Sequence, residues 1–337
     1  MNWLAMDIGG ANLKIADGAG FAQAYSFAMW RDSAALAQQI RTTISEAPQC
    51  NHLVVTMTGE LDDCFETKAL GVQFILNSVR DGSDNRHTRI YLADGRMVTP
   101  QVALTLPTLV AASNWHALAK FAARYAPGKA SLLVDVGSTT CDVIPIVDGQ
   151  PAAHGQTDTQ RLLSGELVYT GVERSPVCAV VGAAAYREQT CPLVQETFAT
   201  MLDAYLVLEE LPEDAANHLT ADSRPATKVA ARARLGRMVA ADSEEFNHRD
   251  AVALARAAAD AQAALLAKAM ERVCESAAAP VDSIIVSGHG DFLARAALQR
   301  LQWNQPVVSL GKELGPAISR SATAHALAVL AREALSR

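Results

Sequence analysis

Two segments far apart in the chain follow one pattern, and this repeat constrains the possible folds more than any other feature. In each segment an apolar run ends in an aspartate, a glycine turn with a polar tip follows, and a second apolar run begins. The segments are residues 3–15 and 132–147. Apolar runs on both sides of a short glycine turn predict a β-hairpin. Two copies of this unit predict a duplicated domain with a ligand bound between its halves.

The turn of the second segment has the composition of a phosphate site. Its glycine, serine and threonines offer hydroxyl groups and unpaired amides, which together can form an anion cradle. Asp135 stands at the end of a buried strand, where a carboxylate can hold hydrated Mg²⁺ against phosphates. An ordinary tight hairpin is the alternative. The first segment favours the phosphate site because it aligns in three places: Asp7 with Asp135, Gly9 with Gly137, and Asn12 with Thr140.

Composition and charge narrow the class of protein. The chain has 337 residues, of which 50% are hydrophobic and 19% charged, as expected of a globular protein with two domains. A net charge of −7 without a basic cluster argues against a nucleic-acid partner. No signal peptide is recognisable, and no apolar run reaches the roughly 18 residues of a membrane span. Six scattered cysteines indicate reduced thiols. We therefore expect a soluble, cytoplasmic protein without a membrane partner.

The order of the expected elements gives the fold class. After the first hairpin we expect a strand over 22–30, a helix over 33–47 capped by Ser33, and a buried strand over 52–58. This order is typical of an α/β domain with a mixed sheet. We place an N-terminal domain at 1–127 and a C-terminal domain at 128–315. A short strand is expected over 177–185, and an amphipathic helix over 316–337 is expected to pack on the N-terminal domain.

Other polar side chains are candidates for the same site. Thr56, Thr58 and Glu60 come at the carboxyl end of a buried strand, which usually faces the ligand crevice. Lys68 lies close behind, where a solvated loop is the simpler explanation. Arg174 could bind a carboxylate or phosphate in bidentate fashion, or form a structural ion pair.

A third glycine turn follows a strand expected over 283–287. Gly288, His289 and Gly290 lead into a helix from residue 292. Glycines at such a place let the backbone approach a flat ligand, and the start of a helix favours an anion.

The three turns occur in the sequences DIGGANLK, DVGSTTCDV and VSGHGDFLA. In this order they resemble the superfamily of sugar kinases, heat-shock chaperones and actin. The resemblance implies two related ribonuclease H-like domains with mixed sheets and an interdomain cleft. Residues 57–72 and 164–177 resemble, more narrowly, the hydantoinase/oxoprolinase-related branch linked to tetrahydromethanopterin one-carbon metabolism. This branch includes archaeal methanofuran synthase.

The resemblance implies a reaction that is unusual for this fold. The cradle would hold the diphosphate of an aminomethylfuran-methyl diphosphate, and a phenol of a glutamyl-tyramine or tyrosine-type acceptor would displace it. Mg²⁺ and backbone amides would stabilise the departing charge. Asp7 and Asp135 would position the Mg²⁺, directly or through water, and Glu60 or Lys68 would orient the amine or deprotonate the phenol. The implied binding residues are Gly9, Gly10, Asn12, Lys14, Gly137, Ser138, Thr139, Thr140, Arg174, Gly288, His289 and Gly290.

Two of these assignments have alternatives within the chain. Lys14 could neutralise phosphate or simply end the hairpin. His289 stands where a smaller residue is expected between the two glycines, which alters the pocket that holds adenine in kinases.

Other functions compatible with the fold remain open at this stage. An ATP-dependent small-molecule kinase would bind nucleotide at 288–290 and use a catalytic aspartate, for which Asp142 is the nearest candidate. A nucleotide-sensing regulator would need a peptide-binding domain, which is not evident. Hydantoin hydrolysis is disfavoured because no cluster of histidines and carboxylates suggests a metal site. A homodimer is left open.

Overall fold

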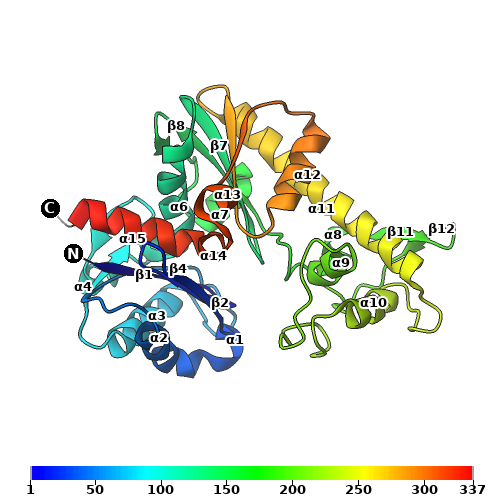
Figure 1. The fold of residues 1–337 in the computed structure, drawn as a ribbon, viewed down its shortest axis with the longest axis horizontal. Helices are drawn as coiled ribbons and strands as arrows, with labels where there is room; N and C mark the ends of the chain where they lie inside the picture. Colours follow the sequence, from blue (N-terminus) through cyan, green and yellow to red (C-terminus); the bar gives the residue numbers. More distant parts are fainter. Residues whose placement is uncertain (1, 336–337) are drawn as a thin grey trace.

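The computed structural model describes residues 2–335 and contains two six-stranded mixed sheets (Figure 1). The first sheet has the order β3-β2-β1-β4-β5-β6. Its strands are β1 (Trp3–Ile8), β2 (Asn12–Ala16), β3 (Ala22–Ser26), β4 (His52–Met57), β5 (His87–Tyr91) and β6 (Met97–Val98). The second sheet is built from β7 (Ala130–Val136), β8 (Cys141–Val147), β9 (Gln150–Pro151), β10 (Leu167–Val168), β13 (Ser283–Ser287) and β14 (Val307–Ser309).

The two sheets repeat one topology, which confirms the predicted α/β class and the predicted duplication. In the first sheet β1, β4 and β5 run parallel while β2 and β3 are antiparallel to their neighbours. In the second sheet β7, β13 and β14 run parallel, and β8 and β9 are antiparallel. The hairpin registers also correspond, because Asp7 lies opposite Lys14 and Asp135 lies opposite Asp142.

The first sheet is covered on both faces, and its central strand alternates accordingly. Leu4, Met6 and Ile8 share a buried cluster with α2 (Leu36–Ser45) and α3 (Lys68–Gly82). Trp3 and Ala5 point to the opposite face and pack with α15 (Ala322–Leu335) and α6 (Asn114–Ala122). Near its C-terminal end the chain returns to the first sheet (Figure 1). The expected helix is divided into α14 (Pro316–Ser319) and α15, and its residues 336–337 lie outside the described part.

A separate lobe interrupts the second half between β10 and β13 (Figure 1). It contains α8 (Val177–Val180), β11 (Ala183–Tyr186), β12 (Gln189–Pro192), α9 (Met201–Val207) and α10 (Lys228–Arg237). The 29-residue helix α11 (His248–Ser276) leads from this lobe back to the second sheet, and α12 (Asp291–Leu301) packs against it. A fully buried ion pair of 2.7 Å between Arg234 and Asp203 fixes α10 to α9.

Three expected elements differ in the structure. The strand expected over 22–30 ends at Ser26, because the amides of Phe27 and Met29 bond to the carbonyls of the first hairpin turn and the chain enters α1 (Met29–Asp32). Ser33 caps no helix, since it lies in a 3₁₀ turn and α2 begins at Leu36. The strand expected over 177–185 is wrong: an i→i+4 bond closes α8 there, and only the segment after it is extended.

The remaining helices are short and connect the layers. They are α4 (Pro100–Ala103), α5 (Pro107–Val110), α7 (Asp158–Ser164) and α13 (Leu310–Leu314), with a 3₁₀ turn η2 (Ala123–Tyr125) after α6. Across residues 2–335, every helix is too short or too polar to cross a bilayer.

Candidate functional site

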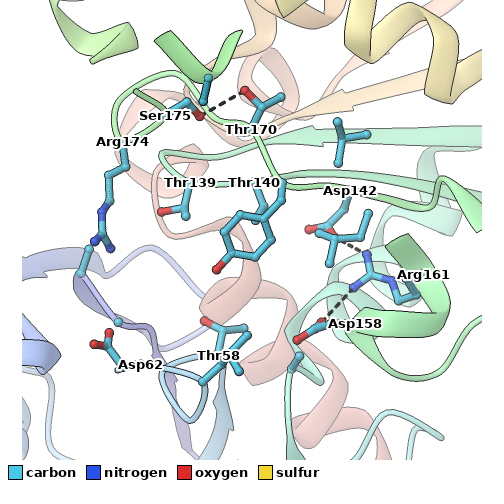
Figure 2. A pocket seen from close by; sticks show the side chains of 18 of the residues that line it. Thr58, Asp62, Thr139, Thr140, Asp142, Asp158, Arg161, Thr170, Arg174 and Ser175 are labelled. Carbon is cyan, nitrogen blue, oxygen red and sulfur yellow. Dashed lines mark hydrogen bonds and ion pairs between the residues drawn. The ribbon is translucent and has the colours of Figure 1, made fainter. Parts of the chain in front are cut away.

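A cleft of about 580 Å³ lies where the tips of the two hairpins meet. We call it the central cleft. One wall comes from the first half of the chain, and the other comes from the second half, including α7 (Figure 2). Its polar lining consists of Thr58, Asp62, Asp63, Asn114, Thr139, Thr140, Asp142, Asp158, Arg161, Tyr169, Thr170, Arg174 and Ser175. Its apolar lining includes Leu61, Leu167, Val168, Val180 and Leu265.

The two hairpin turns have the same internal hydrogen bond. The Gly9 amide donates to the Asn12 carbonyl at 2.9 Å, and the Gly137 amide donates to the Thr140 carbonyl at 2.9 Å. This correspondence confirms the alignment of the two turns that the sequence predicts.

The carbonyls at both tips are bound by neighbouring segments. Amides of Phe27 and Met29 donate to the first tip, and amides of residues 172–174 donate to the second. The tip amides of Gly10, Ala11, Ser138 and Thr139 have no hydrogen-bond partner within residues 2–335. Two turns with unbonded amides at one cleft can accept the oxygens of an anion.

Carboxylates from both hairpins lie beneath these tips. Asp7 is 3% exposed, and its Oδ1 atom is buried without a hydrogen-bond partner. Burial raises the pKa of Asp7, Lys14 opposes this shift, and Asp142 adds to it. Burial also raises the pKa of Asp135 to about 6, with a further contribution from Asp142 on the adjacent strand, while Ser287 and Lys14 oppose it. Crowded carboxylates with elevated pKa values are typical of cation and functional sites.

A chain of ion pairs forms one side of the cleft. Arg161 is 1% exposed and donates to Asp142, while its other terminal nitrogen is 3.9 Å from Asp158 (Figure 2). Its guanidinium lies 4.5 Å from the ring centroid of Trp115. Asp158 in turn accepts from Lys68 at 3.1 Å, so the chain of pairs connects α7 to α3 on the first half.

On the opposite side, Arg174 is held by stacking and not by a carboxylate. Its guanidinium lies 4.3 Å from the ring centroid of Trp30 and points toward Asp62 (Figure 2). Burial raises the pKa of Asp62 to about 6, together with the hydrogen bond and charge of Asp63, whereas Arg174 opposes the shift. A Cβ atom on Gly10 would lie 2.5 Å from the Asp62 carboxylate, so the turn needs glycine for this close approach.

A second cavity of about 850 Å³ lies beyond Arg174, and we call it the outer cavity. Ala11 and Arg174 line both spaces. The outer cavity is bounded by β2, β3, α14 and the loop before α10. Its polar lining consists of Asn12, Gln23, Ser26, Arg31, Glu173, Arg174, Thr200, Asp214, Asn217, His218, Thr220, Ser223, Arg320 and Ser321.

The structure brings some of the predicted residues to the two cavities. Gly10, Thr139, Thr140 and Arg174 line the central cleft, and Asn12 and Arg174 line the outer cavity. Gly9, Gly137 and Ser138 form the turns behind them. Arg174 forms no ion pair within residues 2–335, which removes the structural alternative considered for it.

Other predicted residues lie away from both cavities. Glu60 is 1% exposed, both of its oxygens lack partners, and burial raises its pKa to about 7. Lys68 lines a neighbouring hollow and is engaged with Asp158. Thr56 is buried against Ser113 at 2.8 Å. The catalytic roles of Glu60 and Lys68 therefore stay predictions.

The third glycine turn packs against the protein itself. A Cβ atom on Gly288 would lie 2.1 Å from the Val136 carbonyl, and one on Gly290 would lie 2.4 Å from the Val136 side chain. The His289 ring is instead 3.1 Å from Glu173, at the edge of the outer cavity. Neither glycine lines the central cleft or the outer cavity, and the binding of a flat ligand at this turn stays a prediction.

Sequence reasoning missed Asp62, Asp63, Asp158, Arg161 and Arg320. Asp62 and Asp63 follow Glu60 closely after the same buried strand, and this placement could have indicated them. Arg161 and Asp158 lie in a helix that begins with a capping box at Thr157, which is a readable local signal. The position of that helix beside the first half is not contained in any local pattern.

The architecture and sequence together define the class of protein. Residues 52–333 match the hydantoinase/oxoprolinase family model, and the chain belongs to this family. A relative from Methanocaldococcus jannaschii is 28% identical over 99% of this chain and 98% of its own length. It is described as (4-{4-[2-(gamma-L-glutamylamino)ethyl]phenoxymethyl}furan-2-yl)methanamine synthase. A relative from Methanococcus vannielii with the same description is 27% identical over 62% of this chain and 93% of its own.

Two solved structures of similar extent also match this chain, at low sequence identity and with TM-scores below 0.5. Component A of the Acidaminococcus fermentans (R)-2-hydroxyglutaryl-CoA dehydratase is 11% identical and covers both chains completely, with a TM-score of 0.47. The polyphosphate/ATP-glucomannokinase of an Arthrobacter strain is 13% identical over 98% of this chain and 99% of its own, with a TM-score of 0.46. The assignment of the fold rests on the repeated strand order described above.

Proposed function

We propose that this protein is a transferase of methanofuran-type cofactor biosynthesis. It would join an aminomethylfuran-methyl diphosphate to the phenol of a glutamyl-tyramine or tyrosine-type acceptor and release diphosphate. The observation that carries this proposal is the pair of equivalent turns whose free amides meet at a cleft with an apolar wall. The description of the full-length archaeal relative names a product with the expected phenoxymethyl-furan ether.

The proposed reaction breaks one carbon–oxygen bond and forms another. The bond between the furan-bound methylene and the diphosphate breaks, and its electron pair leaves on the diphosphate. The leaving diphosphate would be stabilised by hydrogen bonds from the free amides of Gly10, Ala11, Ser138 and Thr139. The phenol oxygen forms the new ether bond to the methylene and loses its proton.

Asp62 is the carboxylate best suited to accept that proton. Asp62 and its neighbour Asp63 line the central cleft without an ion pair among residues 2–335, whereas Asp142 and Asp158 are engaged in ion pairs. With a pKa of about 6, Asp62 is ionised near neutral pH and remains basic enough for general-base catalysis. Leu61, Leu167 and Leu265 offer the apolar surface against which two aromatic rings could lie.

The residues present fit a magnesium ion held together with the substrate. Among residues 2–335 no group of three or more metal-ligating side chains could hold an ion alone. Mg²⁺ commonly takes one or two carboxylates and completes its shell with water and phosphate oxygens. Asp7 and Asp135 are the carboxylates that would hold it, and the unbonded Oδ1 atom of Asp7 supports this assignment. The ion would neutralise charge on the departing diphosphate.

A kinase of the same fold finds less support in the geometry. Its candidate catalytic base, Asp142, accepts a hydrogen bond from Arg161. Its candidate nucleotide contact, the third glycine turn, is not among the residues that line either cavity.

Calorimetric titration separates the two functions. We expect Mg²⁺-diphosphate to bind and Mg²⁺-ATP to bind at least roughly tenfold more weakly, a difference of about 1.4 kcal/mol. Tighter binding of ATP, accompanied by phosphorylation of a small molecule, would contradict the transferase and support the kinase.

A further inference from the structure

The two cavities that meet at Arg174 differ in charge. The central cleft is lined by the carboxylates of Asp62, Asp63, Asp142 and Asp158 and by the guanidinium groups of Arg161 and Arg174. Arg161 is already engaged by Asp142 and Asp158. The cleft therefore has an excess of negative charge, which favours a cation or neutral rings over a polyanion.

The outer cavity has an excess of positive charge among its lining side chains. It is lined by the guanidinium groups of Arg31, Arg174 and Arg320 and by the carboxylates of Glu173 and Asp214. Arg31 pairs with Asp32 at 3.0 Å. Neither Arg174 nor Arg320 has a carboxylate within 4.0 Å anywhere in residues 2–335. Two unpaired guanidinium groups at one cavity, in a chain of net charge −7, indicate an anionic ligand.

The pKa of Glu173 reflects the cations that lie near this residue. Burial acts to raise its pKa, but His289, Arg320 and Lys14 outweigh burial, so the pKa of Glu173 is lowered. In the central cleft, by contrast, the pKa of Asp62 is raised. Of the groups that act on Glu173, Arg320 lines the outer cavity together with Glu173 itself. Glu173 lies next to the second turn, whose Ser138 carbonyl accepts from the Glu173 amide at 3.1 Å.

The turn amides connect the two cavities. Ala11 borders both spaces, Thr139 faces the central cleft, and Asn12 faces the outer cavity. A phosphate held at the turn tips would therefore have the acidic cleft on one side and the basic cavity on the other. The geometry points to the outer cavity as the diphosphate-binding chamber, with Arg320 contacting the diphosphate directly while the furan ring lies in the central cleft. This assignment rests on the proposed function, whose substrate carries the diphosphate.

The test uses inorganic diphosphate as the probe and the full-length chain with and without Mg²⁺. Arg320→Ala is the test variant, and Arg80→Ala is the matched control because it removes an exposed guanidinium that lines neither cavity and is paired with Asp81. We expect Arg320→Ala to weaken diphosphate binding roughly tenfold or more, and Arg80→Ala to change it less than about threefold. Arg320→Lys should restore part of the affinity, since it keeps the charge and loses the fork of donors.

Three results would overturn the assignment. They are unaltered diphosphate affinity in Arg320→Ala, equal losses in both arginine variants, and no diphosphate binding by the unaltered protein. Because the probe needs no turnover, a failure of the proposed function has a different signature. In that case diphosphate binding would depend on Arg320, while no ether product would form.

Discussion

At the scale of single residues, the ionised carboxylate of Asp135 is proposed to hold a cation, but its burial destabilises the fold. Its pKa is raised to about 6 by burial and by Asp142 on the adjacent strand. A carboxyl whose pKa is higher in the folded protein destabilises the fold once it ionises. This cost is absent below the unfolded pKa near 3.8 and complete above about pH 6. A bound cation would offset this cost, and carboxyl groups with raised pKa values are therefore expected at cation sites.

Asp135→Asn should therefore stabilise the protein and abolish its activity. Removing the charge should raise the free energy of unfolding at pH 7.5 by up to about 3 kcal/mol, because one pKa unit corresponds to about 1.4 kcal/mol, with little change at pH 4. Denaturant unfolding at the two pH values measures this difference, and a turnover assay measures the loss of function. A variant that is less stable at pH 7.5, or active with Mg²⁺, would contradict the role given to Asp135.

At the scale of secondary-structure elements, the second turn depends on the segment that lies against it. Gly171 packs directly on this turn, where an added Cβ atom would lie 2.4 Å from the Thr139 amide nitrogen. The segment is held from the other side by Gln262 of α11, which donates to Thr170 at 2.7 Å and to the Gly171 carbonyl at 2.9 Å. The long helix thus positions the turn that is proposed to bind diphosphate.

Gly171→Ala should displace the turn and weaken diphosphate binding. The clash involves backbone atoms, so the turn must move, and we expect a loss of affinity of roughly tenfold or more. Gly182→Ala is the control, because an added Cβ atom there meets nothing within 4 Å. Calorimetry with Mg²⁺-diphosphate compares the two variants. Equal affinities would mean that the position of this turn does not determine binding.

The hairpins were predictable from the sequence, and the start of the lobe at α8 was not. Each hairpin is a local pattern in which an apolar run, Asp7 or Asp135, and a glycine turn lie within a few residues of one another. The lobe is built from short elements such as α8, whose hydrogen bonds depend on contacts with distant residues; for example, the Val177 amide bonds to the Ala199 carbonyl. Local propensity is a weak guide where such tertiary contacts decide the structure.

At the scale of the whole molecule, one ion pair spans the two halves at the central cleft. Lys68 on α3 donates to Asp158 on α7 at 3.1 Å. The sequence predicted a site role for Lys68 because it follows a strand end, but the direction of its side chain depends on how the halves meet. For the same reason Asp62 was missed and Glu60 was selected, although only Asp62 lines the cleft.

Lys68→Met separates a catalytic role from a structural one. If Lys68 only links the halves, the KM for the diphosphate substrate should rise severalfold while kcat stays within about threefold, because the partly exposed pair contributes at most about 1 kcal/mol. If Lys68 deprotonates the phenol, kcat should fall by two or more orders of magnitude. Steady-state kinetics with saturating acceptor distinguishes these outcomes.

The central claim is that the cleft forms an aryl ether by displacing diphosphate. The most direct measurement is to incubate the purified protein with Mg²⁺, an aminomethylfuran-methyl diphosphate and glutamyl-tyramine or tyrosine. Mass spectrometry then follows the ether product while released diphosphate is quantified. We predict ether and diphosphate in equal amounts, without any requirement for ATP. Absence of the ether with every acceptor, together with ATP-dependent phosphorylation of one of them, would contradict the account.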